Sequence, residues 1–305
     1  MIFSGKGYIE NNLYVTGFAW SPAYLIDGDV PVIFESGFHC MARIYEADIR
    51  QVIENKMPQY LFITHVHYDH CGATSYLRKA FPSIRVAASQ RAAEIIQRPN
   101  AQSLMSSLSK NAYGIISSME NVDKKMLLQD YFEPFSIDMT LKDMDRIYVC
   151  HGITVQVFET PGHTRDMLSY YIPEKKILIA TESTGCRSQT GHIVTEFLVD
   201  FEKYITSLKR LSMLDIDVLC QGHHFVFTGD DVRRHLDESL KSAQRFRDNV
   251  ISFLKEEGGS VDRVVEIVKA MEYDTNPGPK QPEKAYLLNL RTRVAHIAQS
   301  LSSVK

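Results

Sequence analysis

The chain has 305 residues, of which 44% are hydrophobic, so it is long enough to bury a substantial core. Its 37 acidic and 34 basic residues give a formal net charge of -3. This balance argues against the basic surface that nucleic acids and anionic membranes attract. We therefore expect a small-molecule substrate and neither nucleic acid nor membrane as a partner, and we leave open a homodimer.

The cysteines and the N-terminus bear on the cellular compartment. Five cysteines are scattered and form no C-x-x-C pair, which argues against a disulfide framework and against a thiolate zinc site. The opening stretch MIFSGKGYIENNLYV has no apolar run after a basic start, and no run of about 18 apolar residues follows. We expect a reducing, cytoplasmic location without a signal peptide or transmembrane helix.

The N-terminal segment alternates short β-type runs with turn residues. Asp27-Gly28 separates the apolar runs PAYLI and VPVIF, which predicts a hairpin. A helical pattern from about 41 to 55 then leads into the strand YLFITH, which ends where a group of histidines begins. These histidines are thus expected in a loop after a buried strand, a common place for residues that perform chemistry.

Helices and strands continue to alternate along the chain. The pattern predicts a helix at 76–80, a strand at 84–88 and a Ser-capped helix at 89–98. Residues 101–129 predict a helical insertion, after which the runs FSIDMTL, DRIYV, ITVQVFE and MLSYYI return to strands. The order is that of an α/β protein.

Three amphipathic helical patterns follow Phe227. Each has an apolar stripe but too little area to fold alone, so we expect these helices to pack on the preceding domain. The predicted organisation is a catalytic domain over residues 1–228 and a C-terminal helical extension over residues 229–305.

The sequence THVHYDHCG concentrates potential metal ligands. His65 and His67 are two residues apart and share one side of an extended segment, while Asp69 and His70 follow at the turn. Imidazole nitrogens and a carboxylate suit zinc, iron(II) or manganese, and two neighbouring groups can hold two ions. Three later segments can complete such sites, each after a predicted strand: His163 in TPGHT, Glu182 after KILIAT, and His223-His224 after DVLC.

THVHYDH, TPGHT, an acidic residue after a strand, and QGHH occur in this order and resemble the metallo-β-lactamase superfamily over about residues 8–228. The resemblance implies a four-layer αβ/βα sandwich, with two mixed sheets face to face, helices outside and a metal site at one edge. Total length, the THxHYDHCG motif, the insertion and the C-terminal helices resemble the quinolone-signal response type within it.

The resemblance also implies roles for individual residues. His65, His67 and His163 would bind a first metal ion, Asp69, His70 and His223 a second, and Glu182 would bridge the two. The early acidic residue of the family falls on Glu35, where it would orient a ligand. The family usually has aspartate at both of these acidic positions, so the longer Glu182 puts metal spacing and occupancy of the second site in question.

Several roles have a plain structural alternative. Glu182 and Glu35 could be hydrogen-bonded carboxylates without metal contact, and His224 could replace His223 as ligand. Tyr68 could hydrogen-bond a substrate oxygen as a catalytic residue or could simply pack against the core. Cys71 and Cys220 lie beside ligands, but we expect them to pack, because imidazoles already complete the sites.

A binuclear site would activate a bridging hydroxide for attack on a small ester, thioester or lactone, with Asp69 orienting it and delivering a proton. Zinc is the expected metal, with iron and manganese as alternatives. A mono-iron sulfur dioxygenase, a phosphodiesterase and a regulatory binding protein with a retained metal site are the competing functions. The extension is expected to cap the cleft, with Met271, Tyr286 and Leu287 in its wall.

Overall fold

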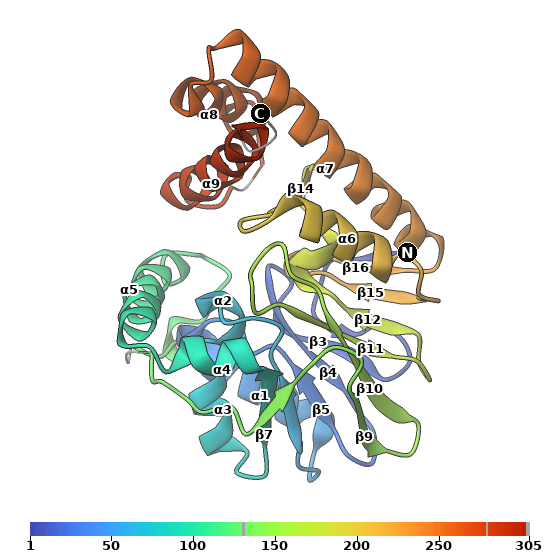
Figure 1. Ribbon diagram of the computed structural model, residues 1–305. Coiled ribbons are helices and arrows are strands. Elements are labelled where there is room, and N and C mark those ends of the chain that lie inside the picture. The colour runs from blue at the N-terminus through green and yellow to red at the C-terminus, as the bar shows by residue number, and fades with distance from the viewer. Residues whose placement is uncertain (130–131, 279, 303–305) are drawn as a thin grey trace.

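The computed structural model describes residues 1–129, 132–278 and 280–302. Two mixed sheets pack face to face, and helices cover the outer side of each (Figure 1). This is the four-layer αβ/βα sandwich predicted from the sequence, so the fold prediction is confirmed. Residues 279 and 303–305 of the predicted extension lie outside the described residues.

The first sheet is built mainly from the N-terminal half of the chain. It is antiparallel from β2 to β5 and parallel from β5 to β8. The Asp27-Gly28 turn joins two antiparallel strands, as predicted. In spatial order the strands are β2 (Gly7–Tyr8), β3 (Leu13–Phe18), β4 (Ser21–Ile26), β5 (Val32–Phe34), β6 (Tyr60–Phe62), β7 (Arg85–Ser89) and β8 (Met139–Leu141).

The second sheet is antiparallel except where β12 runs parallel to β15. A separate short hairpin is formed by β13 (Cys186–Arg187) and β14 (Ile193–Val194), which lie between β12 and β15 in the sequence. In spatial order the strands of the sheet are β1 (Ile2–Phe3), β16 (Val226–Thr228), β15 (Val218–Cys220), β12 (Ile177–Ile179), β11 (Leu168–Ile172), β10 (Ile153–Glu159) and β9 (Arg146–Cys150).

Apolar side chains from the facing sides of both sheets form the central core. The rings of Phe34 and Phe62, from neighbouring strands of the first sheet, stack with centroids 5.3 Å apart. The Phe62 ring also lies 5.2 Å from that of Tyr170 in the second sheet. Removing this apolar surface from water holds the two sheets together.

Helices from the first half of the chain cover the outer face of the first sheet. Their bounds are η1 (His39–Met41), α1 (Ala42–Ile53), α2 (Tyr68–Cys71), α3 (Thr74–Ala80), α4 (Gln90–Ile96), α5 (Pro99–Ile116) and η2 (Lys124–Met126). The Ser89 hydroxyl accepts a hydrogen bond from the Ala92 N–H at 3.0 Å, which is the predicted N-cap of α4.

The helical insertion is shorter than the predicted 101–129. Its main helix, α5, ends at Ile116, and only the single turn η2 follows before residue 129. The hydroxyl of Ser118 donates to the carbonyl of Ile115 at 2.6 Å, and that of Ser117 donates to Gly114. Such local side-chain bonds compete with continued helix, which explains the early end.

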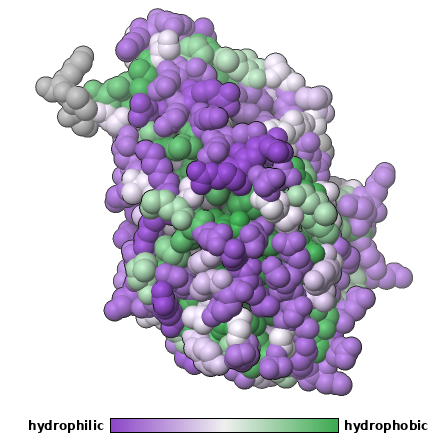
Figure 2. Space-filling model, turned by 90° about the vertical axis from the view of Figure 1, so that its right-hand side faces the viewer, coloured by the Kyte–Doolittle hydropathy of each residue, from purple (hydrophilic) through white to green (hydrophobic). Residues whose placement is uncertain are grey.

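The helices from the second half of the chain share a core with the second sheet. They are η3 (Thr181–Thr184), α6 (Phe201–Leu211), α7 (Asp230–Glu256), α8 (Val261–Lys269), the π-helical turn η4 (Ala270–Asp274) and α9 (Glu283–Ser302). Leu236 and Phe246 of α7 pack in one cluster with Phe227 of β16. The face in Figure 2 is mostly hydrophilic, with hydrophobic residues in separate small areas. Among the described residues no helix is long and apolar enough to cross a membrane.

Candidate metal centre

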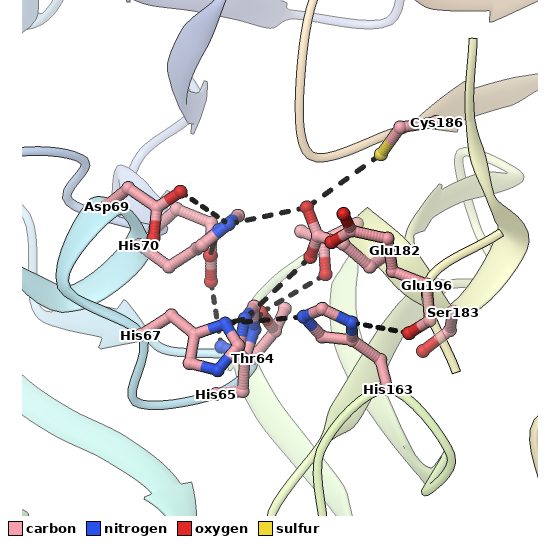
Figure 3. Close-up of polar contacts among 12 residues, drawn as sticks. Thr64, His65, His67, Asp69, His70, His163, Glu182, Ser183, Cys186 and Glu196 are labelled. Carbon is pink, nitrogen blue, oxygen red and sulfur yellow. Dashed lines mark hydrogen bonds and ion pairs between the residues drawn. The ribbon is translucent and has the colours of Figure 1, made fainter. Parts of the chain in front are cut away.

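The predicted ligands come from loops that follow four strands of the sandwich. His65 follows β6 and begins the short segment that leads into α2, where Asp69 and His70 lie. His163 follows β10, Glu182 lies in η3 after β12, and His223 follows β15. The ends of these strands meet at one edge of the two sheets, so residues far apart in sequence face one another there (Figure 3).

His65, His67 and His163 form a first group. The Nε2 atom of His65 lies 3.0 Å from Nδ1 of His67, and Nε2 of His163 lies 3.3 Å from the same Nδ1. One ligand atom from each residue falls within 4.8 Å of the others. Three imidazole nitrogens directed at a common point suit a tetrahedral zinc site that keeps one position open.

Asp69, His70 and His223 form a second group, again with ligand atoms within 4.8 Å of one another. The Oδ2 atom of Asp69 lies 3.8 Å from Nε2 of His70 and 3.7 Å from Nε2 of His223. The side chain of Asp69 is 20% exposed, whereas that of His70 is 4% exposed. Asp69 and His223, whose side chain is 27% exposed, are therefore the members of this group that solvent reaches.

The carboxylate of Glu182 lies between the two groups. Its Oε1 atom is 3.3 Å from Nε2 of His70 and 3.3 Å from Nε2 of His223, while Oε2 is 3.8 Å from Nε2 of His65. Oε2 is buried and has no hydrogen-bond partner among the described residues. A buried carboxylate oxygen without a donor, facing imidazole lone pairs, fits a site for divalent cations.

Hydrogen bonds on the far side of three rings fix their tautomers. Nδ1 of His163 donates to the carbonyl of Glu196 at 2.7 Å, and Nδ1 of His223 donates to the carbonyl of Trp20 at 2.8 Å. A carbonyl only accepts, so each Nδ1 carries the proton and each Nε2 presents a lone pair to the centre. Nδ1 of His70 has the same relation to the Glu35 carboxylate, at 2.6 Å.

Glu35 is buried and joins two parts of the centre. Its Oε2 accepts from His70, and its Oε1 accepts from the Thr64 N–H at 2.7 Å. Thr64 precedes His65, and the Thr64 hydroxyl lies 3.0 Å from Nδ1 of His65. Glu35 thus orients the His70 ring directly and fixes the backbone beside His65, and its role in metal binding stays a prediction.

Burial and neighbouring charges set the protonation of the ligands. Burial, reinforced by nearby imidazoles, lowers the pKa of His65 well below its usual value and lowers that of His67. Burial opposes the charge on His70, but Glu182 and Asp69 outweigh it and raise its pKa. Burial likewise disfavours ionised Glu182, but His70 and His65 hold its pKa well below the usual value. A cation entering the second group would therefore displace a proton from His70.

Two residues of the centre were missed in the sequence. Asp166 is buried, and its Oδ2 accepts from the Val66 N–H at 2.9 Å, so it fixes the loop between His65 and His67. Its place three residues after His163, in TPGHTRD, was an available signal. Glu196 supports His163 through its main-chain carbonyl, a role that its residue type does not reveal.

The structure distinguishes His223 from His224. His223 faces Asp69 and Glu182, whereas His224 has a positive φ of 72° and its N–H donates to the Ala19 carbonyl. Burial lowers the pKa of His224 to about 4. His224 belongs to none of the candidate ligand groups found among the described residues.

Tyr68 and the cysteines belong to none of the candidate ligand groups found among the described residues. The Tyr68 ring packs edge-on against Phe38 with centroids 5.5 Å apart, and burial raises the pKa of its hydroxyl, so it stays protonated. Cys71 and Cys220 are buried in the core clusters. Cys186 was not singled out in the sequence, yet its Sγ lies 3.8 Å from Oε1 of Glu182 (Figure 3).

The three predicted wall residues of the extension have different environments. Tyr286 is 7% exposed and stacks on Tyr273 with centroids 4.5 Å apart. Met271 is 54% exposed, and Leu287 packs against the second-sheet cluster. Their role in a cleft stays a prediction, for which the buried Tyr286 is the least suited.

Comparison with known proteins identifies the family. The model of the metallo-beta-lactamase superfamily matches residues 21–223, more than half of the chain. The chain therefore belongs to the metallo-beta-lactamase superfamily.

Two curated relatives show how distant the characterised members are. A hydroxyacylglutathione hydrolase of Bartonella tribocorum is 23% identical over 234 residues, which cover 75% of this chain and 72% of the relative. A beta-lactamase-like protein 2 homolog of Caenorhabditis elegans is 25% identical over 202 residues, which cover 66% of this chain. The chain spans only 54% of that relative's length.

Solved structures extend the similarity to the whole fold. An inverting sec-alkylsulfatase of Pseudomonas sp. superposes with a TM-score of 0.65 at 15% identity, covering 97% of this chain and 50% of that one. An archaeal metallo-beta-lactamase superfamily protein of Sulfolobus tokodaii gives a TM-score of 0.58 at 15% identity, covering 97% of this chain and 100% of that one. At these identities the similarity concerns the fold alone.

Proposed function

We propose that this protein is a binuclear metallo-hydrolase that cleaves a small ester, thioester or lactone. The observation that carries the proposal is the position of Glu182, whose two oxygens face different ligand groups. A carboxylate in this position can serve both ions at once, as the sequence resemblance implies. The nitrogen and oxygen donors suit zinc first, with iron or manganese as alternatives.

Two divalent cations bound here would lower the pKa of a water molecule to near neutrality and polarise the electrophilic carbonyl. Asp69 is partly exposed and supplies the carboxylate of the second group, so it can orient the nucleophile and hold a proton destined for the leaving group. Tyr68 stays protonated and can donate a hydrogen bond to an oxygen that gains negative charge.

The relatives favour the thioester among the candidate bonds. An acylglutathione is a thioester, and two matching curated relatives, from two Bartonella species, are hydroxyacylglutathione hydrolases. The acidic balance of the chain argues against a polyanionic nucleic acid as substrate. A cytoplasmic location remains our expectation for the protein in the cell, and a homodimer remains open.

The test is turnover of a substrate panel by protein stripped of metal and reloaded with zinc, iron(II) or manganese. The panel holds aliphatic thioesters, esters, lactones and a chromogenic phosphodiester, and oxygen uptake with a persulfide is measured in parallel. Asp69→Asn is the active-site variant, and Asp29→Asn, at an exposed aspartate, is its matched control.

We expect thioester or ester turnover that a chelator abolishes, that Asp69→Asn reduces at least a hundredfold and that Asp29→Asn leaves unchanged. Persulfide-dependent oxygen uptake without hydrolysis would replace the proposal with a sulfur dioxygenase. Phosphodiester turnover alone would identify a phosphodiesterase. Full activity of Asp69→Asn with both metals retained would remove the proton-delivery role.

A further inference from the structure

One face of the C-terminal helix α9 makes hydrogen bonds to the segment 195–201. The Asn289 amide donates to Oε1 of Glu196 at 3.0 Å, and the Arg293 guanidinium donates to the carbonyl of Thr195 at 3.3 Å. One turn further, Nε2 of His296 accepts from the Phe201 N–H at 3.0 Å. Spacings of four and three residues place these side chains on one side of the helix.

The segment 195–201 in turn makes hydrogen bonds to the loop that carries His163. The Glu196 carbonyl accepts from Nδ1 of His163 at 2.7 Å, on the side of the ring away from His67 (Figure 3). The N–H groups of Val199 and Asp200 donate to the carbonyl of Gly162, at 3.0 and 3.3 Å. His163 is therefore fixed in both ring orientation and backbone position by residues that α9 holds.

The contact between Arg293 and Thr195 is buried. Arg293 is 2% exposed, Thr195 is 1% exposed, and the guanidinium lies 4.3 Å from the centre of the Phe246 ring. The Nε atom of Arg293 is buried and has no hydrogen-bond partner among the described residues. A buried cation is costly, and the bonds that Arg293 makes here are to the Thr195 carbonyl and the Phe246 ring.

We propose that Asn289 and Arg293 are positioning residues of the metal centre, acting through Glu196 on His163. The C-terminal extension then supports the first metal-binding group through the contacts of α9. This inference rests on the metal-binding part of the proposed function and is independent of which bond is cleaved. The second group, Asp69, His70 and His223, receives no such support from α9.

The size of the effect follows from the length of the chain of contacts. Changing a partner that directly orients a metal-bound histidine typically weakens metal affinity about 10- to 100-fold. Asn289 acts one contact further away, so we expect Asn289→Ala to weaken the metal affinity of the first group, which contains His163, about tenfold. Arg293→Lys keeps the charge but loses the planar donor, and we expect a smaller loss at the same site.

The experiment is competitive titration of the stripped full-length protein with zinc and a chromophoric chelator, which resolves the two affinities without an activity assay. Thr292→Ala is the matched control, because the exposed Thr292 hydroxyl donates to the Leu288 carbonyl within its own helix. Thermal unfolding of each metal-free variant reports any general loss of stability. A second set of variants carries Asn289→Ala in a His163→Ala or a His223→Ala background.

We expect Asn289→Ala to weaken binding in the His223→Ala background and to have no further effect in the His163→Ala background, since coupling requires His163. Unchanged affinities in Asn289→Ala, or equal loss at both sites together with lower metal-free stability, would overturn the inference. If the unmodified protein takes up no metal, the proposed function fails with it. Two unchanged affinities in the single variant Asn289→Ala, in a protein that does bind metal, would reject the inference alone.

Discussion

The Oε1 atom of Glu182 lies 3.3 Å from the Nε2 atom of His70, at the point where the two candidate metal groups meet. The same carboxylate faces His223 and His65, so one side chain contacts both groups. The usual aspartate of the family is one methylene shorter, yet the η3 turn brings the longer side chain to the shared position.

Removing the negative charge of Glu182 should weaken the binding of one of the two metal ions. We expect Glu182→Gln to retain about one metal ion per chain where the unmodified protein retains two, because the second ion loses an anionic ligand. Metal content by elemental analysis after gel filtration checks this. Glu120→Gln, at an exposed position in a turn, is the control. Two tightly bound ions in Glu182→Gln would show that Glu182 is not a shared ligand.

Gly222 permits Glu182 to occupy its position. A Cβ atom added at Gly222 would fall on the Glu182 carboxylate. We expect Gly222→Ala to displace that carboxylate, to lower stability by about 1–3 kcal/mol and to reduce metal retention. Gly114→Ala, in an exposed helical position where an added Cβ meets nothing within 4 Å, should leave both quantities unchanged or slightly raise stability. Equal metal content in the two variants would contradict this close packing.

Glu35 should control the second group through His70. Its carboxylate accepts the Nδ1 proton of His70, which directs Nε2 toward Glu182 and Asp69. We expect Glu35→Gln to weaken metal binding at the second group about 10- to 100-fold while leaving the first group intact. Competitive titration measures both affinities. Loss at the first group alone would assign Glu35 to the support of Thr64 and His65 instead.

His235 should make stability depend on pH at a point outside the ligand groups. It is fully buried on α7, where Nε2 lies 3.1 Å from the carbonyl of Thr184, and burial lowers its pKa to about 4. An unfolded histidine titrates near pH 6.5. Between these values the unfolded chain binds a proton that the folded chain does not, so stability falls as pH decreases.

The contribution of His235 to the free energy of unfolding is complete above about pH 6.5 and is lost by about pH 4. Its size is about 3 kcal/mol. We expect His235→Gln to be less stable at neutral pH and to lose this part of the decline between pH 6.5 and 4. Urea denaturation of metal-free protein at several pH values measures it, with His151→Gln, at an exposed histidine, as control. Parallel pH profiles for His235→Gln and the unmodified protein would exclude His235 as the source.

The clustering of the candidate ligands could be predicted because these residues lie in short motifs with a fixed order. THVHYDH and the later histidines each follow an apolar strand, and parallel or neighbouring strands bring such loops to one edge. The choice of His223 over His224 needed the three-dimensional structure, since only there is His223 seen beside Asp69 and Glu182.

The supporting contacts could not be predicted from local patterns. Asn289 and Glu196 are 93 residues apart, and the role of Glu196 toward His163 uses a main-chain carbonyl that any residue supplies. The extension also proved continuous with the core, because the α7 side chains Leu236 and Phe246 cover the sheet strand that Phe227 comes from. Hydrophobic periodicity predicted the helices but not the partners of their polar faces.

The most direct test of the central claim is a crystal structure of the zinc-loaded protein with anomalous scattering data collected at the zinc edge. We expect two anomalous peaks per chain, about 3.5–4 Å apart, one among His65, His67 and His163 and the other beside His223, with Glu182 between them. A single peak at the first group, with Glu182 contacting no metal, would contradict the binuclear centre.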